Sequence, residues 1–329
     1  LHYALPICRI RVGHGDLHCA NSAVVDGRPQ LFDAIEFDDA IATGDVLYDV
    51  AFLVMDLDVH GDRRAARRLL GRWLLESARL EARGPHLRDL EEVLLAEIDA
   101  LAALPLWLSI RAALRAKIAA ATSRHVEGAA REAQEALARR FFAAACGFVE
   151  PVTPRLVAIG GLSGAGKSTL ARGLACDLMP APGAMVLRSD EIRKLVAGVG
   201  ATVRLGPEHY TRAASDRVYR LLLAAAAAAL AAGRSVITDA VSLHPEERAR
   251  FGAIARATEA EFTGLWLDVD AAVAAARADD RRDDASDADA AVVAFQSARG
   301  PGAVDWRRID AGGTPEATLA AARAALHEG

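Results

Sequence analysis

The sequence predicts a protein in two parts, a mostly helical part over residues 1–148 and an α/β domain over residues 156–329 whose parallel sheet is flanked by helices. Leu and Ala recur at helical spacing among Arg and Glu through residues 61–148. From Leu156 onward, short apolar runs alternate with helical segments, which is typical of a parallel sheet. The stretch "GFVEPVTPRL" between the two patterns carries two prolines, so we interpret residues 149–155 as a linker.

The composition indicates an ordinary globular protein. Of 329 residues, 52% are hydrophobic and 25% are charged, and the net charge of −5 disfavours a protein that coats long nucleic acids. The four cysteines show no C-x-x-C spacing, so we expect reduced thiols and a cytoplasmic protein. No apolar run has the length and bulk of a membrane span, and no pattern predicts the oligomeric state.

The N-terminal part begins with strands and continues with helices. Asp26-Gly27 separates the apolar runs "SAVV" and "QLFDAIEF", which predicts a hairpin. Gly84-Pro85 and Pro105 divide residues 61–148 into three or four helices.

The α/β domain contains five predicted strands. They are, in order, "RLVAIGG", "AMVLRS", "SVITDA", "FTGLWLDV" and the weaker "DWRRIDA", and a helix is predicted from Lys167.

A phosphate-binding pattern follows the first of these strands. Gly161-x-x-x-x-Gly166-Lys167-Ser168 stands between a strand and a helix, which is the context that makes this motif specific. Loop N–H groups and the helix N-terminus would bind the phosphates of ATP, Lys167 would reach the β- and γ-phosphates, and Ser168 would bind Mg²⁺. The predicted binding residues are Gly161, Ser163, Gly164, Ala165, Gly166, Lys167, Ser168 and Thr169.

Two carboxylates complete this predicted site. Asp239 ends the strand "SVITDA" and would act on Mg²⁺ with Ser168, and the Ala240 that follows, in place of Glu, disfavours a hydrolytic motor. Asp190 and Arg193 are three residues apart and share a helix face. The Asp could accept a proton from a substrate hydroxyl and the Arg could hold a substrate anion. The alternative is an acidic helix start with a solvated Arg.

Arg277 and Arg281 are four residues apart within "RADDRRDDASDADA". Such a pair can form a lid that stabilises a transferred phosphoryl group, so we assign both to the predicted catalytic set. The alternative is a helix face joined by Asp–Arg pairs.

These motifs together resemble the P-loop kinases, the group with polynucleotide kinases, gluconate-kinase-like enzymes and zeta-toxin-like "AAA domain" proteins. The resemblance covers residues 156–310. It implies Asp190 as general base, Arg193 as contact to a substrate phosphate, and Arg281 as transition-state arginine. The acidic lid of this chain departs from a polynucleotide binder and disfavours a long nucleic-acid substrate.

A second resemblance covers residues 10–125. "HGDLHCAN" resembles the catalytic loop of aminoglycoside phosphotransferase-like kinases, which implies Asp16 as catalytic residue and Asn21 as metal ligand. The family's second metal carboxylate corresponds to Glu36, with Asp33 as the alternative. Asp45 and Asp49 match the family's structural "GD…YD" pair.

Residues before His14 contain no Gly-rich strand pair and no ATP-anchoring Lys. We therefore expect a degenerate second site in the N-terminal part and ATP at Lys167.

The sequence thus predicts an ATP-dependent phosphotransferase that acts on a hydroxyl of a small metabolite or short nucleotide. The alternatives are an ATP-binding regulatory or scaffold module with little turnover, and the remnant of a bifunctional aminoglycoside phosphotransferase-like kinase. The identity of the acceptor stays open.

Overall fold

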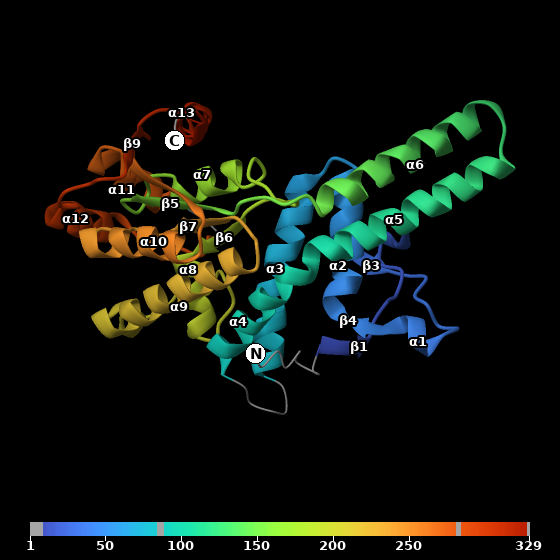
Figure 1. The fold of residues 1–329 in the computed structure, drawn as a ribbon. Coiled ribbons are helices and arrows are strands. Elements are labelled where there is room, and N and C mark those ends of the chain that lie inside the picture. The colour runs from blue at the N-terminus through green and yellow to red at the C-terminus, as the bar shows by residue number, and fades with distance from the viewer. Residues whose placement is uncertain (1–8, 84–88, 281–283, 328–329) are drawn as a thin grey trace. The chain divides into compact units, whose positions relative to one another are not determined.

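The computed structural model describes residues 9–83, 89–280 and 284–327, and the chain divides into two compact units (Figure 1). Unit 1 comprises Leu1–Trp73 and Ala100–Val152, and unit 2 comprises Leu74–Asp99 and Thr153–Gly329.

Unit 1 combines two small antiparallel sheets with helices. Strand β1 pairs with β4, and β2 pairs with β3 in a two-residue hairpin in which Asp26 and Gly27 both have positive φ, as the sequence predicts. Its strands are β1 (Ile10–Val12), β2 (Ser22–Val25), β3 (Arg28–Leu31) and β4 (Thr43–Asp45). Its helices are α1 (Asp39–Ala42), α2 (Val46–Val59), the start of α3 (Arg63–Ala82), α5 (Leu104–Thr122) and α6 (Gly128–Phe148).

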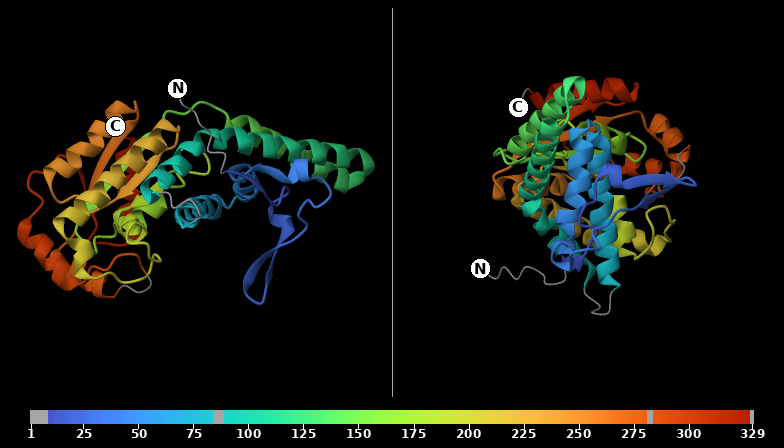
Figure 2. Two further views of the ribbon diagram at one scale, coloured as in Figure 1. Left: turned by 90° about the horizontal axis from the view of Figure 1, so that it is seen from below. Right: turned by 90° about the vertical axis from the view of Figure 1, so that its right-hand side faces the viewer.

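Helices α5 and α6 form an antiparallel pair, which the left view of Figure 2 shows side by side. Leu104, Leu108 and Ala112 recur every four residues on the buried face of α5, and Ser109 Oγ donates to Ala145 O across the pair at 2.8 Å. Pro105 lies in the first turn of α5, where a missing N–H costs nothing, so this proline marks a helix start. The predicted break at Gly84-Pro85 lies outside the described residues.

One stretch of the described chain, Leu90–His125, is long and apolar enough to cross a membrane by length and composition. Buried helices of globular proteins meet the same criterion. Leu101, Leu104 and Leu108 in this stretch are buried in the protein itself.

Unit 2 is built on a five-stranded parallel sheet in the order β6-β7-β5-β8-β9. All five predicted strands and the helix start at Lys167 are confirmed. The strands are β5 (Arg155–Gly161), β6 (Met185–Arg188), β7 (Val236–Asp239), β8 (Glu261–Asp268) and β9 (Arg307–Asp310). The helices are α4 (Leu90–Asp99), α7 (Lys167–Leu174), α8 (Ser189–Val196), α9 (Arg212–Ala231), α10 (Pro245–Ala257), α11 (Ala271–Asp279), α12 (Ala290–Arg299) and α13 (Pro315–His327).

The central strand β5 contributes buried side chains to the cores on both faces of the sheet. Leu156 and Ala158 pack into the core with α9 and α10, whereas Val157 and Ile159 pack into the core with α7 and α13. Figure 1 shows these two helix layers on opposite sides of the sheet. This alternation follows from the two-residue period of a strand, and burial on both faces explains why "RLVAIGG" reads as a continuous apolar run.

The units divide between Val152 and Thr153, inside the predicted linker, but residues 74–99, predicted to belong to the N-terminal part, belong to unit 2. Val93, Leu94 and Ile98 of α4 are buried in the same core as Leu222 of α9. Arg217 of α9 also donates to Glu91 at 2.5 Å. Helical periodicity shows that α4 has a buried face, but it does not show which core buries that face.

Candidate active site

The phosphate-binding pattern forms a tight loop between β5 and α7. The chain leaves the centre of the sheet at Gly161, beside the point where the strand order reverses, and this is where parallel α/β sheets bind ligands. Gly161, Gly164 and Gly166 have φ values of +138°, +83° and +94°, which L-residues with side chains rarely adopt. A Cβ at Gly164 would also lie 2.0 Å from Ala274 O. A Cβ at Gly161 would lie 2.9 Å from Leu267 O. The close packing of neighbouring backbone therefore requires glycine at both positions, in addition to the φ values.

The loop offers hydrogen-bond donors without acceptors. The main-chain N–H groups of Gly164, Gly166 and Ser168 have no acceptor among the residues that the structure describes. Gly164, Gly166 and Ser168 also line a cavity of about 1900 Å³. Such a set of N–H groups at the start of a helix is a site for an anion.

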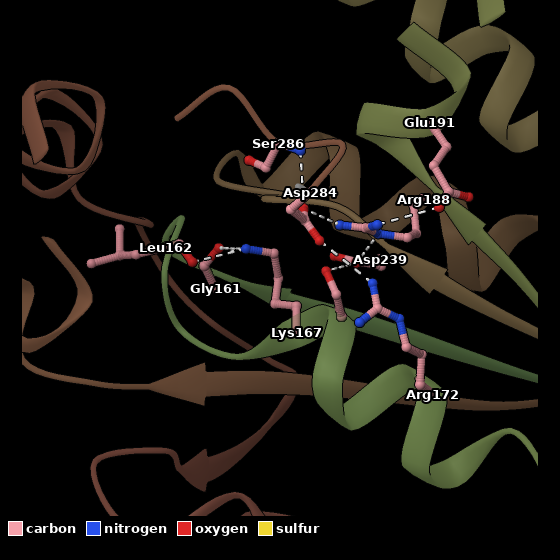
Figure 3. A network of polar contacts seen from close by, with 10 residues as sticks. Gly161, Leu162, Lys167, Arg172, Arg188, Glu191, Asp239, Asp284 and Ser286 are labelled. Atoms are coloured by element: carbon pink, nitrogen blue, oxygen red, sulfur yellow. Dashed lines mark hydrogen bonds and ion pairs between the residues drawn. The ribbon is translucent and has the colours of Figure 1, made fainter. Parts of the chain in front are cut away.

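Lys167 and Ser168 begin α7. Figure 3 shows the Lys167 side chain directed toward Gly161 and Leu162 of the loop. Lys167 is buried, and its Nζ donates to Gly161 O at 3.0 Å and Leu162 O at 2.8 Å. Ser168 Oγ donates to Asp239 Oδ2 at 2.5 Å, so the two side chains predicted to act on Mg²⁺ are in contact.

Arg188, the last residue of β6, connects three carboxylates (Figure 3). It donates to Asp239 at 3.2 Å, to Glu191 at 3.2 Å and to Asp284 at 2.8 Å. Burial disfavours its charge, but the attraction of these carboxylates outweighs burial and raises the pKa of Arg188 above its ordinary value. Arg188 therefore remains charged and holds Asp239 in place beside Ser168.

Asp190 lies on the first turn of α8 and lines the same cavity. Burial raises the pKa of this carboxyl above its ordinary value of 3.8, and the negative charge of Asp239 raises it further. Arg188, the Ser286 hydroxyl and Lys167 act in the opposite direction. A carboxylate with a raised pKa in a cavity has the property required of a general base.

Arg193 lies one turn beyond Asp190 and also lines the cavity. Its guanidinium donates to His209 O at 2.6 Å and stacks at 4.8 Å from the ring centre of Tyr210. Its Nε is buried and has no hydrogen-bond partner among the described residues. The structure thus brings Asp190 and Arg193 to one cavity, as their spacing predicts.

Asp287 joins the segment before α12 to the segment around Tyr210. Its Oδ2 accepts from the buried Lys194 Nζ, from Leu205 N at 3.1 Å and from the Tyr210 hydroxyl. Burial alone would raise the pKa of Asp287, but the hydrogen bonds from Lys194, Tyr210 and Leu205 outweigh it, and the pKa is lowered.

The two predicted lid arginines have different outcomes. Arg277 lines the cavity, and its guanidinium donates to the carbonyl oxygens of Ala311, Gly312 and Gly313 at 2.7–3.2 Å. It would have to release these carbonyls to reach a phosphoryl group. Arg281 lies outside the described residues.

Several residues of the site were not predicted. Arg188, Asp284, Asp287 and Gln296 all contact residues of the predicted set or line its cavity. Arg188 stands at the end of a predicted strand, which was a usable signal because strand ends meet at this edge of the sheet. The other three depend on how residues 284–299 fold back over the loop.

The N-terminal loop of unit 1 is held by hydrogen bonds. Asn21 Nδ2 donates to Asp16 O at 3.0 Å and to Asp16 Oδ2 at 3.1 Å. Asp49 of α2 accepts from His14 N and Gly15 N, so its carboxylate connects the loop to this helix. Glu36 is exposed, and the described residues contain no group of three His, Cys, Asp or Glu side chains that could hold a metal ion.

Part of unit 2 matches a known protein family. Residues 156–300 match the family model described as "AAA domain". Uncharacterized proteins of Mycobacterium tuberculosis (strain H37Rv) and Mycobacterium bovis are 31% identical over 314 residues, which cover 93% of this chain and 57% of each relative. The chain thus spans a little over half the length of the curated relatives it matches.

Solved structures of kinases overlap with about half of the chain. A gluconokinase from Sinorhizobium meliloti 1021 is 20% identical and covers 54% of this chain and 96% of its own, with a TM-score of 0.36. The APS kinase CysC of Mycobacterium tuberculosis is also 20% identical and covers 54% of this chain and 99% of its own, with a TM-score of 0.37. Likeness at this level says nothing about the activity or substrate of this chain.

Proposed function

We propose that unit 2 is an ATP-dependent phosphotransferase that acts on a hydroxyl group of a small metabolite or short nucleotide. The observation that carries the proposal is the combination, in one cavity, of Lys167, the raised-pKa carboxylate of Asp190, and three loop N–H groups without an acceptor among the described residues. A phosphate-binding site alone would also fit a regulatory protein that binds ATP without turnover. A general base such as Asp190 beside that site supports an enzyme.

The loop and the residues next to it would bind the phosphates and the metal ion. The N–H groups of the loop and Lys167 would hold the phosphates of ATP, and Ser168 with Asp239 would hold Mg²⁺. Their contact at 2.5 Å supports a shared role, and a site with a single carboxylate suits Mg²⁺, which keeps phosphate and water ligands. Mg²⁺ would neutralise charge on the phosphates.

The acceptor would lie on the side of Asp190 and Arg193. In the transfer, the acceptor oxygen forms a bond to the γ-phosphorus while the bond from that phosphorus to ADP breaks. Asp190 takes the proton of the acceptor hydroxyl. Arg193 is stacked on Tyr210, and its buried Nε has no partner in the part of the chain that the structure describes, which supports an acceptor that carries an anionic group. Arg277 and Arg281 remain proposed to close on the transferred group.

The test is phosphate transfer from γ-labelled ATP with Mg²⁺, with sugars, sugar acids, nucleosides, aminoglycosides and a 5′-hydroxyl oligonucleotide as acceptors. We expect label on one acceptor class, and a loss of at least about 10²-fold in Lys167→Ala, because a lost charged donor at the phosphates costs transition-state stabilisation. Lys117→Ala, an exposed lysine of α5, is the matched control and should keep the wild-type rate.

Transfer that survives Lys167→Ala at full rate would contradict the proposal. Tight ATP binding with no transfer to any acceptor would instead favour the regulatory or scaffold module.

A further inference from the structure

Gln296 of α12 lies outside every motif of the sequence, yet its side chain makes two hydrogen bonds to one loop residue. Ser163 N donates to Gln296 Oε1 at 2.9 Å, and Gln296 Nε2 donates to Ser163 Oγ at 3.1 Å. A main-chain N–H can only donate, so the amide oxygen must face it and the amide NH₂ must face the hydroxyl. The pair of bonds therefore fixes both the amide and the serine.

Apolar packing holds the same part of the loop. Val293, one turn before Gln296, forms a buried cluster with Ala274 and Ala278 of α11, and Leu162 of the loop packs against it. The first half of the loop is thus fixed by the α11–α12 pair, whereas its second half is continuous with α7.

The contact between Gln296 and Ser163 lies at one end of the expected binding site for the nucleotide's phosphates. Lys167 Nζ rests on the carbonyls of Gly161 and Leu162, which directly precede Ser163. The lysine of such a loop reaches the β- and γ-phosphates, so Ser163 lies at the end that faces the transferable group. The Ser163 N–H already donates to Gln296, whereas those of Gly164, Gly166 and Ser168 have no acceptor within residues 9–83, 89–280 and 284–327.

We propose that Gln296 is a positioning residue for the terminal phosphate of a nucleoside triphosphate, acting through Ser163. The inference rests on the proposed nucleotide site. Gln296 holds the γ-phosphate end of the loop in its binding shape and leaves the remaining N–H groups to the other phosphates. Its loss should weaken binding of a triphosphate more than binding of a diphosphate.

The experiment compares dissociation constants of Mg·ATP and Mg·ADP, measured by displacement of a fluorescent nucleotide, for wild type and variants of the full chain. In Gln296→Met, which keeps length but loses both bonds, we expect ATP binding to weaken about tenfold and ADP binding to change by less than about twofold. In Gln296→Glu the carboxylate can still accept from Ser163 N–H and O–H, but its charge faces the terminal phosphate. ATP binding should then weaken at least as much, with ADP binding again little changed. Ser297→Ala, the exposed next residue of α12, is the control and should match wild type.

Equal weakening of ATP and ADP in both Gln296 variants would overturn the inference and reduce Gln296 to a structural role, as would no weakening of either. If wild type binds ATP but transfers phosphate to no acceptor, the phosphotransferase proposal fails while the ATP-to-ADP comparison still decides the role of Gln296. Wild type that binds neither nucleotide would overturn both.

Discussion

Gly164 shows how strongly a single residue is constrained at this site. Its φ of +83° alone would disfavour another residue, and its Cα also lies against the main chain of α11, where a Cβ would meet Ala274 O at 2.0 Å. The glycine of the motif therefore serves the packing of α11 as well as the turn.

We expect the protonation of Asp190 to set the pH dependence of turnover. As a general base it must be deprotonated, so turnover should fall as pH falls through its raised pKa, with the acid limb of kcat above the ordinary 3.8 of an aspartate. The Ser286 hydroxyl acts to lower this pKa. Ser286→Ala should therefore move the acid limb to higher pH, which a pH profile of kcat measures.

Asp190→Asn is the reference for that profile and should have no measurable acid limb, because almost no turnover remains. An acid limb that shifts to lower pH in Ser286→Ala would show that Asp190 is not the titrating base.

At the scale of elements, α8 has two functions. Asp190 and Arg193 face the cavity, while the neighbouring Lys194 is buried and bound to Asp287. Asp287 also accepts from Leu205 and Tyr210, so one carboxylate joins α8 to a segment that lines the cavity.

We expect Asp287→Asn to lower the free energy of unfolding of unit 2 by about 2 kcal/mol, because it leaves the buried Lys194 charge without its counter-ion. Amide hydrogen exchange should also become faster over residues 203–210. Asp289→Asn removes the charge from the exposed contact to Arg204 at 3.8 Å, and its amide oxygen can still accept from Val292 N at the start of α12, so it is the matched control. Equal exchange over residues 203–210 in both variants would show that Asp287 does not hold this segment.

At the scale of the whole molecule, the chain forms two units, and one of their boundaries, between Val152 and Thr153, lies in the proline-rich linker, whereas the boundaries at residues 73–74 and 99–100 do not. Helix α4, far from the sheet in sequence, buries Val93, Leu94 and Ile98 in the core of unit 2. Helix α5 buries Leu108 within unit 1.

This division predicts two thermal transitions with different responses to ligand. Mg·ATP should raise only the transition of unit 2, because a ligand stabilises the unit that binds it. Ile98→Ala should lower that same transition, with a loss of about 2–5 kcal/mol, whereas Leu108→Ala should lower the other. Scanning calorimetry with and without nucleotide distinguishes them. If Ile98→Ala lowered only the ATP-independent transition, residues 74–99 would belong with unit 1.

The sequence alone was sufficient to predict the five strands of the sheet and the position of the phosphate-binding loop. Apolar runs separated by helices predicted all five strands, and Gly166-Lys167-Ser168 predicted the start of α7, because these features depend on residues close together in the chain. Asp190 and Arg193 could be placed on one helix face from their spacing.

Only the tertiary structure decided what depends on contacts between distant residues. It assigned α4 to unit 2, placed Arg188 among three carboxylates, and directed Arg277 to the carbonyls of residues 311–313. It also brought Gln296 to Ser163, 133 residues earlier in the chain. The physical reason is that periodicity shows which face of a helix or strand is buried. It does not show which distant element packs against that face, because this depends on the packing and charge of residues far apart in the sequence.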